Sequence, residues 1–301
     1  MENSESKNPI IVYEGKNGRP KIKVVMKENY FKKSRQSQKP IDANRYPDTN
    51  DIITNALISN SPYPGYWEQS ENCAFSFFER ILKQSNPGIF LDLGCGQGRL
   101  LLKFAKYYKQ AVALDCDRSR IDKAKAMLKN HRIKNIEFIN DSFLKTDMKR
   151  DMFDAVVCSH VIQHINTGEC SAFISKICNI LKPGGTATIL TNHSTKKRDF
   201  FVKSALENNV ISEKEISENQ FNEFIADKSN GLPIHYFTID SLRKYFIGLR
   251  VRDIRVFHCL HANTVADKIV FRDTIANIPL IKNYSGRDVI VIISKLLTPV
   301  L

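Results

Sequence analysis

A loop of three alternating glycines follows an apolar segment that carries a single aspartate. The segment 89–93 reads Ile-Phe-Leu-Asp-Leu, and Gly94, Gly96 and Gly98 lie between it and the amphipathic stretch 99–105. Because glycine has no Cβ, such a loop lets a ligand approach the backbone closely. The start of a helix adds free N–H groups and a positive dipole end, which favour a carboxylate or phosphate. The pattern therefore predicts a cofactor site at a strand–loop–helix turn.

The glycine spacing favours one class of cofactor over another. Dinucleotide-binding loops place glycines at the first, third and sixth positions. Here they occupy the first, third and fifth, and the sixth position is Arg99, which is too large for the close helix–strand contact of a dinucleotide site. Asp92 lies two residues before the first glycine, where a carboxylate can accept hydrogen bonds from an ammonium group. A turn whose glycines serve only steric purposes is the alternative.

The segment 91–98, Leu-Asp-Leu-Gly-Cys-Gly-Gln-Gly, resembles motif I of the class I S-adenosylmethionine-dependent methyltransferases. The resemblance covers roughly residues 86–295 and is strongest in its first half. It implies the Rossmann-like fold of that superfamily, S-adenosyl-L-methionine as cofactor and methyl transfer as the reaction. In that family the loop packs along the methionine part of the cofactor, with its backbone close to the ribose.

The elements that must position this loop alternate between buried strands and amphipathic helices. Such alternation is typical of right-handed crossovers, so we expect an α/β fold with a doubly wound, mostly parallel seven-stranded sheet. The resemblance implies that the last strand is antiparallel. The predicted strands are residues 89–93, 111–114, 136–139, 153–158, 186–190, 251–259 and 288–294. The predicted helices are residues 54–57, 67–83, 98–109, 119–128, 167–181 and 238–247, with Ser119 and Thr238 as N-caps.

Two parts of the chain differ in character. Residues 46–301 are expected to form the methyltransferase domain, with helical insertions after strands five and six at about 191–235 and 260–286. Residues 1–45 form a basic N-terminal extension that is either partly disordered or a short hairpin. The hairpin would pair two apolar runs, residues 10–13 and 22–25, across a glycine-containing turn.

Residues at several strand ends should converge on the cofactor, because ligands of open α/β sheets lie beyond the carboxyl ends of the strands. The resemblance implies that Asp115 accepts both ribose hydroxyls, that Asp141 accepts from the adenine amino group, and that the backbone of Ser159 meets the cofactor's amino group. Helix capping and turn formation are the alternatives for the two aspartates. The predicted cofactor-binding set is Asp92, Gly94, Cys95, Gly96, Gly98, Asp115, Cys116, Asp141, Ser142, Phe143 and Ser159.

Histidines near strand ends are the candidates for catalysis. His160 and His164 follow the fourth strand and His193 follows the fifth, and imidazole titrates near neutral pH. For each of them a structural role is the alternative, and the catalytic residue stays unassigned. The sequence predicts no metal site, because Cys-x-x-Cys pairs are absent and His160 and His164 lack a third ligand.

Composition places bounds on the setting and the partners. The chain has 301 residues, a net charge of +13 and seven cysteines without paired spacing, which indicates reduced thiols and a cytoplasmic location. We expect no secretory signal and no membrane span. Residues 1–40 contain ten Lys and Arg against four Glu, and a basic arm of this kind can bind nucleic acid or a membrane surface. The alternative is a solvated, partly disordered tail that keeps the protein soluble.

Three functional hypotheses follow. The first is methyl transfer from S-adenosyl-L-methionine to an oxygen or nitrogen atom of a small-molecule acceptor, because an insertion with aromatic residues is similar to the substrate-covering segments of small-molecule methyltransferases. The alternative is an RNA methyltransferase that uses the basic N-terminal arm. The second alternative is a cofactor-binding regulatory protein without turnover.

Overall fold

The structure is a computed structural model that describes residues 10–14, 21–25, 66–207, 210–227, 231–246, 249–258 and 267–296. The predicted helix at residues 54–57 lies outside these residues, as does most of the basic extension. Two strands of the extension, β1 (Ile10–Glu14) and β2 (Lys21–Val25), pair antiparallel, as predicted for a hairpin.

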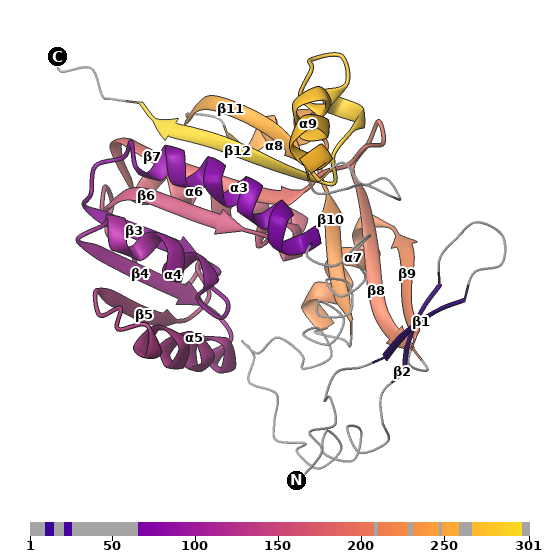
Figure 1. Ribbon diagram of the computed structural model, residues 1–301, viewed down its shortest axis with the longest axis horizontal. Coiled ribbons are helices and arrows are strands. Elements are labelled where there is room, and N and C mark those ends of the chain that lie inside the picture. Colours follow the sequence, from indigo (N-terminus) through magenta and orange to yellow (C-terminus); the bar gives the residue numbers. More distant parts are fainter. Residues whose placement is uncertain are drawn as a thin grey trace, which may run out of the picture.

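The centre of the molecule is a seven-stranded sheet in the order β11-β12-β7-β6-β3-β4-β5 (Figure 1). Neighbouring strands from β7 to β5 pair in parallel, whereas β12 is antiparallel to β7 and to β11. The predicted seven-stranded sheet with an antiparallel last strand is confirmed. Its strands are β3 (Ile89–Leu93), β4 (Gln110–Asp115), β5 (Ile136–Asn140), β6 (Phe153–Ser159), β7 (Leu181–Asn192), β11 (Leu249–Phe257) and β12 (Asp288–Lys295).

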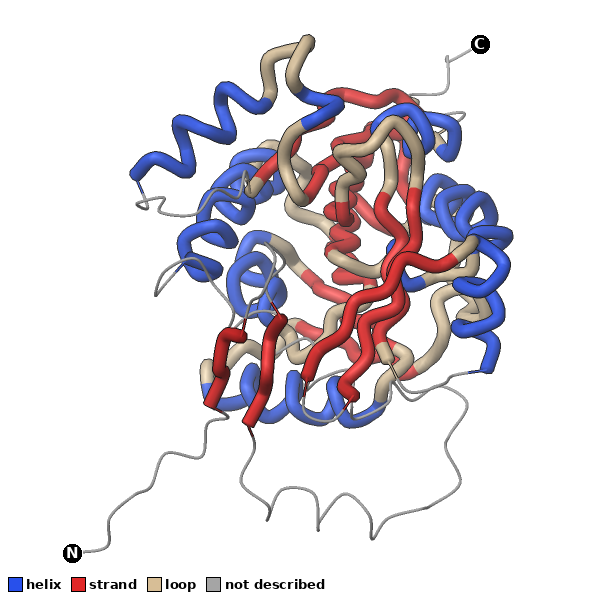
Figure 2. Tube along the Cα trace, turned by 90° about the vertical axis from the view of Figure 1, so that its right-hand side faces the viewer, coloured by secondary structure: helices blue, strands red, loops and turns tan. Residues whose placement is uncertain are grey.

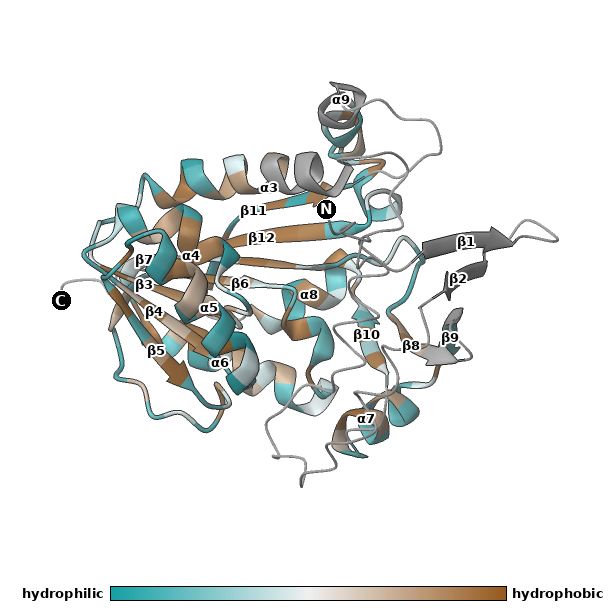
Figure 3. Cartoon of the chain, turned by 60° about the horizontal axis from the view of Figure 1, so that its bottom comes forward, coloured by the Kyte–Doolittle hydropathy of each residue, from teal (hydrophilic) through white to brown (hydrophobic). Residues whose placement is uncertain are grey.

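Helices cover both faces of this sheet (Figure 2). Side chains alternate along each strand, so β3 directs Phe90 into the core beneath α3, α4 and α5 and Leu91 into the core beneath α6 and α8. Figure 3 shows the hydrophobic residues concentrated on these strands, with hydrophilic loops at their ends. The α-helices are α3 (Tyr66–Leu82), α4 (Arg99–Phe104), α5 (Arg118–Asn130), α6 (Cys170–Ile180), α7 (Glu218–Asp227), α8 (Ile239–Tyr245) and α9 (Asp267–Ala276).

Several helix boundaries differ from those predicted. The predicted helix 98–109 divides into α4 and the 3-10 turn η1 (Ala105–Tyr107), and the helix 167–181 divides into η3 (Thr167–Glu169) and α6. The N-cap of α5 is Asp117 and not Ser119, because the Asp117 carboxylate accepts from the backbone N–H groups of Ser119 and Arg120. Thr238 caps α8 as predicted. Two further 3-10 turns are η2 (Ile162–His164) and η4 (Lys282–Tyr284).

The prediction that the insertion after the fifth strand is mostly helical is wrong. The insertion instead supplies three of the five strands of a second sheet. This five-stranded sheet has the order β1-β2-β9-β8-β10 and contains β8 (Phe200–Glu207), β9 (Val210–Ile216) and β10 (Leu232–Tyr236). Among the described residues of the insertion, only α7 is an α-helix, and its Phe221 and Phe224 are buried. The aromatic residues of this insertion do not by themselves distinguish a helix from a strand, because that distinction depends on their spacing. Pairing of β8 with both β9 and β10 overrides the helix propensity of the Glu- and Lys-rich segment 213–215.

Within the described part of the chain, no helix has the length and apolar character needed to cross a membrane. The insertion after β11 contains α9 and η4, in agreement with its predicted helical character.

Candidate functional site

The three glycines of the loop after β3 serve different purposes. All three have positive φ angles: 74° at Gly94, 53° at Gly96 and 84° at Gly98. A Cβ at Gly94 would lie 2.2 Å from a methyl carbon of Val161, and one at Gly98 would lie 3.1 Å from the Cβ of Ala124. A Cβ at Gly96 would meet nothing nearer than 3.9 Å among the described residues. Two glycines are therefore required by packing, and Gly96 borders open space where a ligand can approach the backbone.

Asp92 has a buried carboxylate that no described residue pairs with. Its residue is fully buried, and neither carboxylate oxygen has a hydrogen-bond partner among the described residues. Burial, and secondarily the charge of Asp115, raises its pKa to about 8. An unsatisfied buried carboxylate is costly, so this position calls for a cationic ligand group that donates hydrogen bonds.

Asp115, at the end of β4, shapes the loop. One carboxylate oxygen accepts from the backbone N–H of Gly96 at 2.8 Å and the other from that of Asp117 at 2.9 Å. Burial raises its pKa, although these two backbone hydrogen bonds act in the opposite direction. Asp115 thus holds the backbone of Gly96 in place from the end of the neighbouring strand.

The sheet register gathers the other predicted cofactor residues at one edge. Leu93 pairs with Leu114 on one side and with Cys158 on the other, and Asp115 pairs with Asn140. The ends of β3, β4, β5 and β6 are consequently adjacent. Ser159 at the end of β6 has a buried hydroxyl without a hydrogen-bond partner among the described residues.

Four of the predicted residues are buried to some degree or make contacts within the protein itself. The Asp141 carboxylate accepts from the backbone N–H of Ser142 at 2.7 Å, as in a turn. The Phe143 ring is buried and packs edge-on against Phe173, with ring centroids 4.9 Å apart. Cys95 is buried and Cys116 is half-buried. The position of Phe143 in the core means that its side chain contributes through packing.

The candidate histidines differ in their surroundings. His164 places Nδ1 2.5 Å from the carbonyl oxygen of Pro233, and burial lowers its pKa to about 4. His193 is buried, with Nδ1 3.1 Å from the Gly286 carbonyl oxygen, and burial lowers its pKa. His160 is half-buried, and burial lowers its pKa as well. Within the described residues, no group of three or more His, Cys, Asp or Glu side chains could hold a metal ion.

Sequence reasoning missed a buried ionic cluster at the same edge of the sheet. Asp288 begins β12 and is fully buried; Arg287 donates to it at 2.6 Å, and Nε2 of His258 lies 3.3 Å away. The predicted antiparallel direction of the last strand would have been enough to place Asp288 at this edge. The first residue of an antiparallel strand lies at the edge where its parallel neighbours end.

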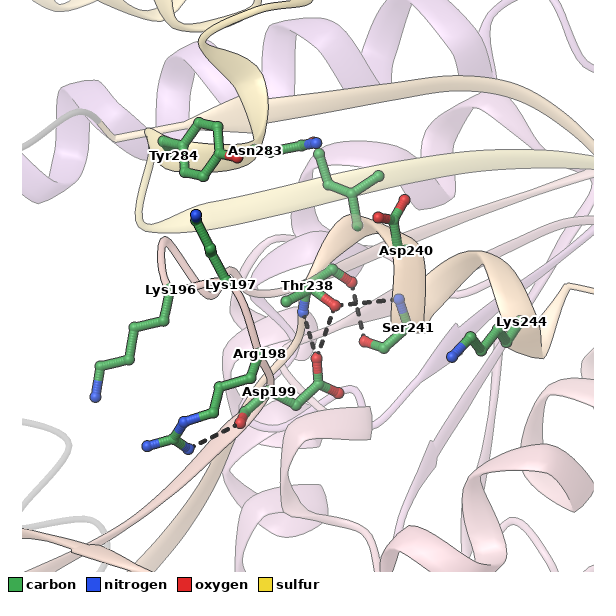
Figure 4. A pocket seen from close by; sticks show the side chains of 11 residues that line it. Lys196, Lys197, Arg198, Asp199, Thr238, Asp240, Ser241, Lys244, Asn283 and Tyr284 are labelled. Atoms are coloured by element: carbon green, nitrogen blue, oxygen red, sulfur yellow. Dashed lines mark hydrogen bonds between the residues drawn. The ribbon is translucent and has the colours of Figure 1, made fainter.

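A cavity of about 490 Å³ lies beyond the end of β7, between the segment 196–199, α8 and η4 (Figure 4). The Asp199 carboxylate accepts from the backbone N–H and the hydroxyl of Thr238, both at 2.8 Å. Lys196 and Arg198 each pair with Glu215 at 2.5 Å. Since the lining contains none of the predicted cofactor residues, this cavity is separate from the glycine loop.

Comparisons with known proteins match the part of the chain that contains the glycine loop. Residues 90–185 match the family model described as a methyltransferase domain. The structure resembles a crystal structure titled as an S-adenosylmethionine-dependent methyltransferase from Clostridium acetobutylicum, with a TM-score of 0.52, 12% identity and coverage of 82% of this chain and 97% of the other. Residues 90–185 therefore form a methyltransferase domain, and the chain has the Rossmann-like fold of the class I S-adenosylmethionine-dependent methyltransferases.

Among curated proteins, the chain is 30% identical over 120 residues to a "Ubiquinone biosynthesis O-methyltransferase" of Rickettsia conorii, covering 40% of each chain. It is 29% identical over 109 residues to a "Demethylmenaquinone methyltransferase" of Lactococcus lactis, covering 35% of this chain and 42% of the other. The chain thus spans about two fifths of the length of these relatives.

Proposed function

We propose that this protein transfers the methyl group of S-adenosyl-L-methionine to an oxygen or nitrogen atom of a small-molecule acceptor. The observation that carries the proposal is the unpartnered Asp92 carboxylate beside the open face of Gly96. The buried Asp92 carboxylate, which no described residue pairs with, fits a ligand with an ammonium group. The open backbone at Gly96 fits a ligand whose flat part packs closely against the loop.

The residues of this edge have distinct roles in the proposal. Asp92 accepts from the cofactor's ammonium group, Asp115 accepts from its ribose hydroxyls, and Gly96 allows close packing. The unpartnered hydroxyl of Ser159 lies at the end of β6, next along the edge. S-adenosyl-L-methionine supplies an electrophilic methyl group on a sulfonium sulfur, so the protein's main contribution is to align an acceptor and exclude water. Such positioning lowers a barrier by roughly 7 kcal/mol or more.

The small-molecule acceptor is supported by the names of the relatives, which include enzymes of ubiquinone biosynthesis and a demethylmenaquinone methyltransferase. The RNA alternative depends on the basic extension, and apart from β1 and β2 those residues lie outside the described part of the chain. The regulatory alternative shares the cofactor site but lacks transfer.

Calorimetric titration tests the cofactor assignment. S-adenosylhomocysteine should bind the full-length chain in the micromolar range, and NAD should not bind. Asp92→Asn should weaken binding at least tenfold, and Asp122→Asn, which removes an exposed carboxylate from α5, should leave it unchanged. Binding of NAD in preference to S-adenosylhomocysteine would refute the assignment.

A labelled-methyl assay tests the acceptor. Extract is separated into macromolecules and a small-molecule filtrate, and each part is divided into ribonuclease-treated and untreated samples. Label in the filtrate supports a small molecule, and ribonuclease-sensitive label among the macromolecules supports RNA instead. Tight cofactor binding with no transfer in any sample favours the regulatory alternative.

A further inference from the structure

A chain of hydrogen bonds determines which nitrogen atoms of His160 and His164 carry protons. It centres on Gln163, whose side-chain oxygen accepts from the backbone N–H of Asn192 at 3.2 Å and from the hydroxyl of Thr191 at 3.1 Å. A backbone N–H can only donate, so the oxygen and not the amide nitrogen of Gln163 must face Asn192. The orientation of the Gln163 amide is thereby fixed.

The fixed amide assigns the tautomers on both sides. Nδ1 of His160 lies 3.2 Å from the Gln163 oxygen, which only accepts, so this nitrogen carries the proton. The Gln163 amide nitrogen lies 3.3 Å from Nε2 of His164, which must accept. Nδ1 of His164 then donates to the Pro233 carbonyl. Both ring nitrogens of His164 are used within the protein, and His164 is a neutral structural residue.

His160 differs because only one of its nitrogens is used in this way. With the proton on Nδ1, the Nε2 atom carries a lone pair, and none of the described residues forms a hydrogen bond with it. His160 directly follows β6, and its neighbour Val161 packs against Gly94 of the glycine loop. Its φ angle of 56° is unusual for a residue other than glycine. Such a conformation is typical of functional sites, because it persists only where the surrounding structure enforces it.

Titratable groups of four other elements interact electrostatically with His160. The Asp288 carboxylate at the start of β12 favours the imidazolium form, whereas Arg287 and Arg99 of α4 disfavour it. Burial lowers the pKa of His164 in η2 and of His258 after β11 to about 4, so both are neutral at pH 7. Burial is the largest influence and lowers the pKa of His160 below its usual value of 6.5. His160 is consequently neutral at pH 7, and Asp288 is placed to stabilise the charge that forms when it gains a proton.

We propose that Nε2 of His160 is the general base of the methyl transfer and that Gln163 is its positioning residue. This inference rests on the proposed function, and it narrows the acceptor to a group that loses a proton, such as a hydroxyl. The hydroxyl proton moves to Nε2 while an oxygen lone pair forms the new C–O bond. The carbon–sulfur bond breaks with its electron pair left on sulfur, and the imidazolium afterwards releases the proton to water.

Nitrogen-15 NMR of the imidazoles tests the assignment without any acceptor. In the full-length protein at pH 7.5 with S-adenosylhomocysteine, His160 should show a protonated Nδ1 and an unprotonated Nε2. His164 should show the same tautomer and stay neutral down to about pH 4. Gln163→Leu should convert His160 to a mixture of tautomers, whereas His131→Gln, an exposed change at the end of α5, should not. A native His160 with its proton on Nε2 overturns the proposal.

Kinetics on the acceptor fraction identified by label transfer gives the second readout. His160→Gln should lower kcat at least 100-fold with an unchanged Kd for S-adenosylhomocysteine, and the remaining activity should rise steadily with pH. Gln163→Leu should lower kcat less and displace the pH profile. A His160→Gln protein with the native kcat and pH profile overturns the proposal. Absence of any acceptor contradicts methyl transfer, while the NMR tautomer still decides whether His160 has the required form.

Discussion

Two fully buried carboxylates lie at the same edge of the seven-stranded sheet in opposite states. Asp92 in β3 has no hydrogen-bond partner among the described residues, and burial raises its pKa to about 8. For Asp288 in β12, burial also acts to raise the pKa, but the charges of Arg287, His160 and His258 outweigh it and lower the pKa to about 2. Burial is common to both, so the partners account for the difference.

The contrast separates the edge into two functional halves. At β12, the protein supplies its own cations and completes the cluster before any ligand arrives. At β3, it leaves a buried acid unsatisfied, at a cost to stability that a cationic ligand can recover. We propose cofactor binding at the β3 half, where Asp92 lacks a partner among the described residues. His160, which we propose as the base, interacts with Asp288 in the β12 half.

The largest effect is expected for Asp288→Asn. Removal of this charge leaves Arg287 and His258 without their carboxylate, which should lower the free energy of unfolding by about 3–5 kcal/mol. Urea unfolding at pH 7 measures the change. In the native protein the Asp288 contribution, roughly 2–3 kcal/mol, is present above pH 4 and is lost as the pH falls toward 2, because the folded-state pKa is depressed. A loss below 1 kcal/mol would show that the cluster does not stabilise the fold.

Asp92→Asn should raise the free energy of unfolding, whereas Asp288→Asn should lower it. A raised folded-state pKa means that the Asp92 contribution to stability is complete below about pH 4 and is lost as the pH rises to about 8. The asparagine variant without ligand should therefore be more stable than the native protein by about 4 kcal/mol at pH 7. Urea unfolding between pH 5 and 8 should show a slope in the native protein that the variant lacks.

Cofactor binding should also displace the Asp92 proton. Close to one proton should be released per S-adenosylmethionine bound at pH 7, measured as the dependence of the calorimetric enthalpy on the ionisation enthalpy of the buffer. Asp92→Asn should abolish this release. Equal enthalpies in all buffers for the native protein would contradict the assignment of Asp92 to the ligand's ammonium group.

Two glycine variants separate packing from binding. Gly94→Ala places a Cβ against Val161 in a left-handed backbone conformation and should cost about 2–4 kcal/mol of stability. Gly96→Ala faces open space and should cost only about 1–2 kcal/mol, while S-adenosylhomocysteine binding falls at least tenfold. Thermal unfolding and calorimetry together give both numbers. A Gly96→Ala protein with native affinity would place the ligand elsewhere.

The smallest effect is expected for Asp115→Ala. It should weaken cofactor binding by roughly 1–3 kcal/mol, because a charged hydrogen-bond acceptor is lost. The Gly96 N–H would also lose its anchor, so Asp115→Asn, which keeps one acceptor oxygen, should be affected less. An unchanged dissociation constant in a folded Asp115→Ala protein would remove Asp115 from the site.

The sequence by itself determined the central fold and the glycine loop. Most of the seven strands contain a short apolar run bounded by polar or glycine-rich residues, and this pattern is local. The position of Asp92 before three alternating glycines likewise depends only on neighbouring residues. The pattern also placed Asp115 and Ser159 at the ends of their strands, β4 and β6, which pair with β3 on its two sides.

Only the tertiary structure decided the rest, because those features depend on partners far apart in the chain. Residues 200–207 and 210–216 form strands because β8 pairs with β9 and β10, not because of their local propensity. His164 is structural because the carbonyl of Pro233, 69 residues away, accepts a hydrogen bond from its Nδ1–H, and the state of Asp288 depends on His160 and His258 from two other strand ends. The pKa values of the buried carboxylates and the tautomers of the histidines depend on such long-range neighbours, which a sequence pattern does not specify.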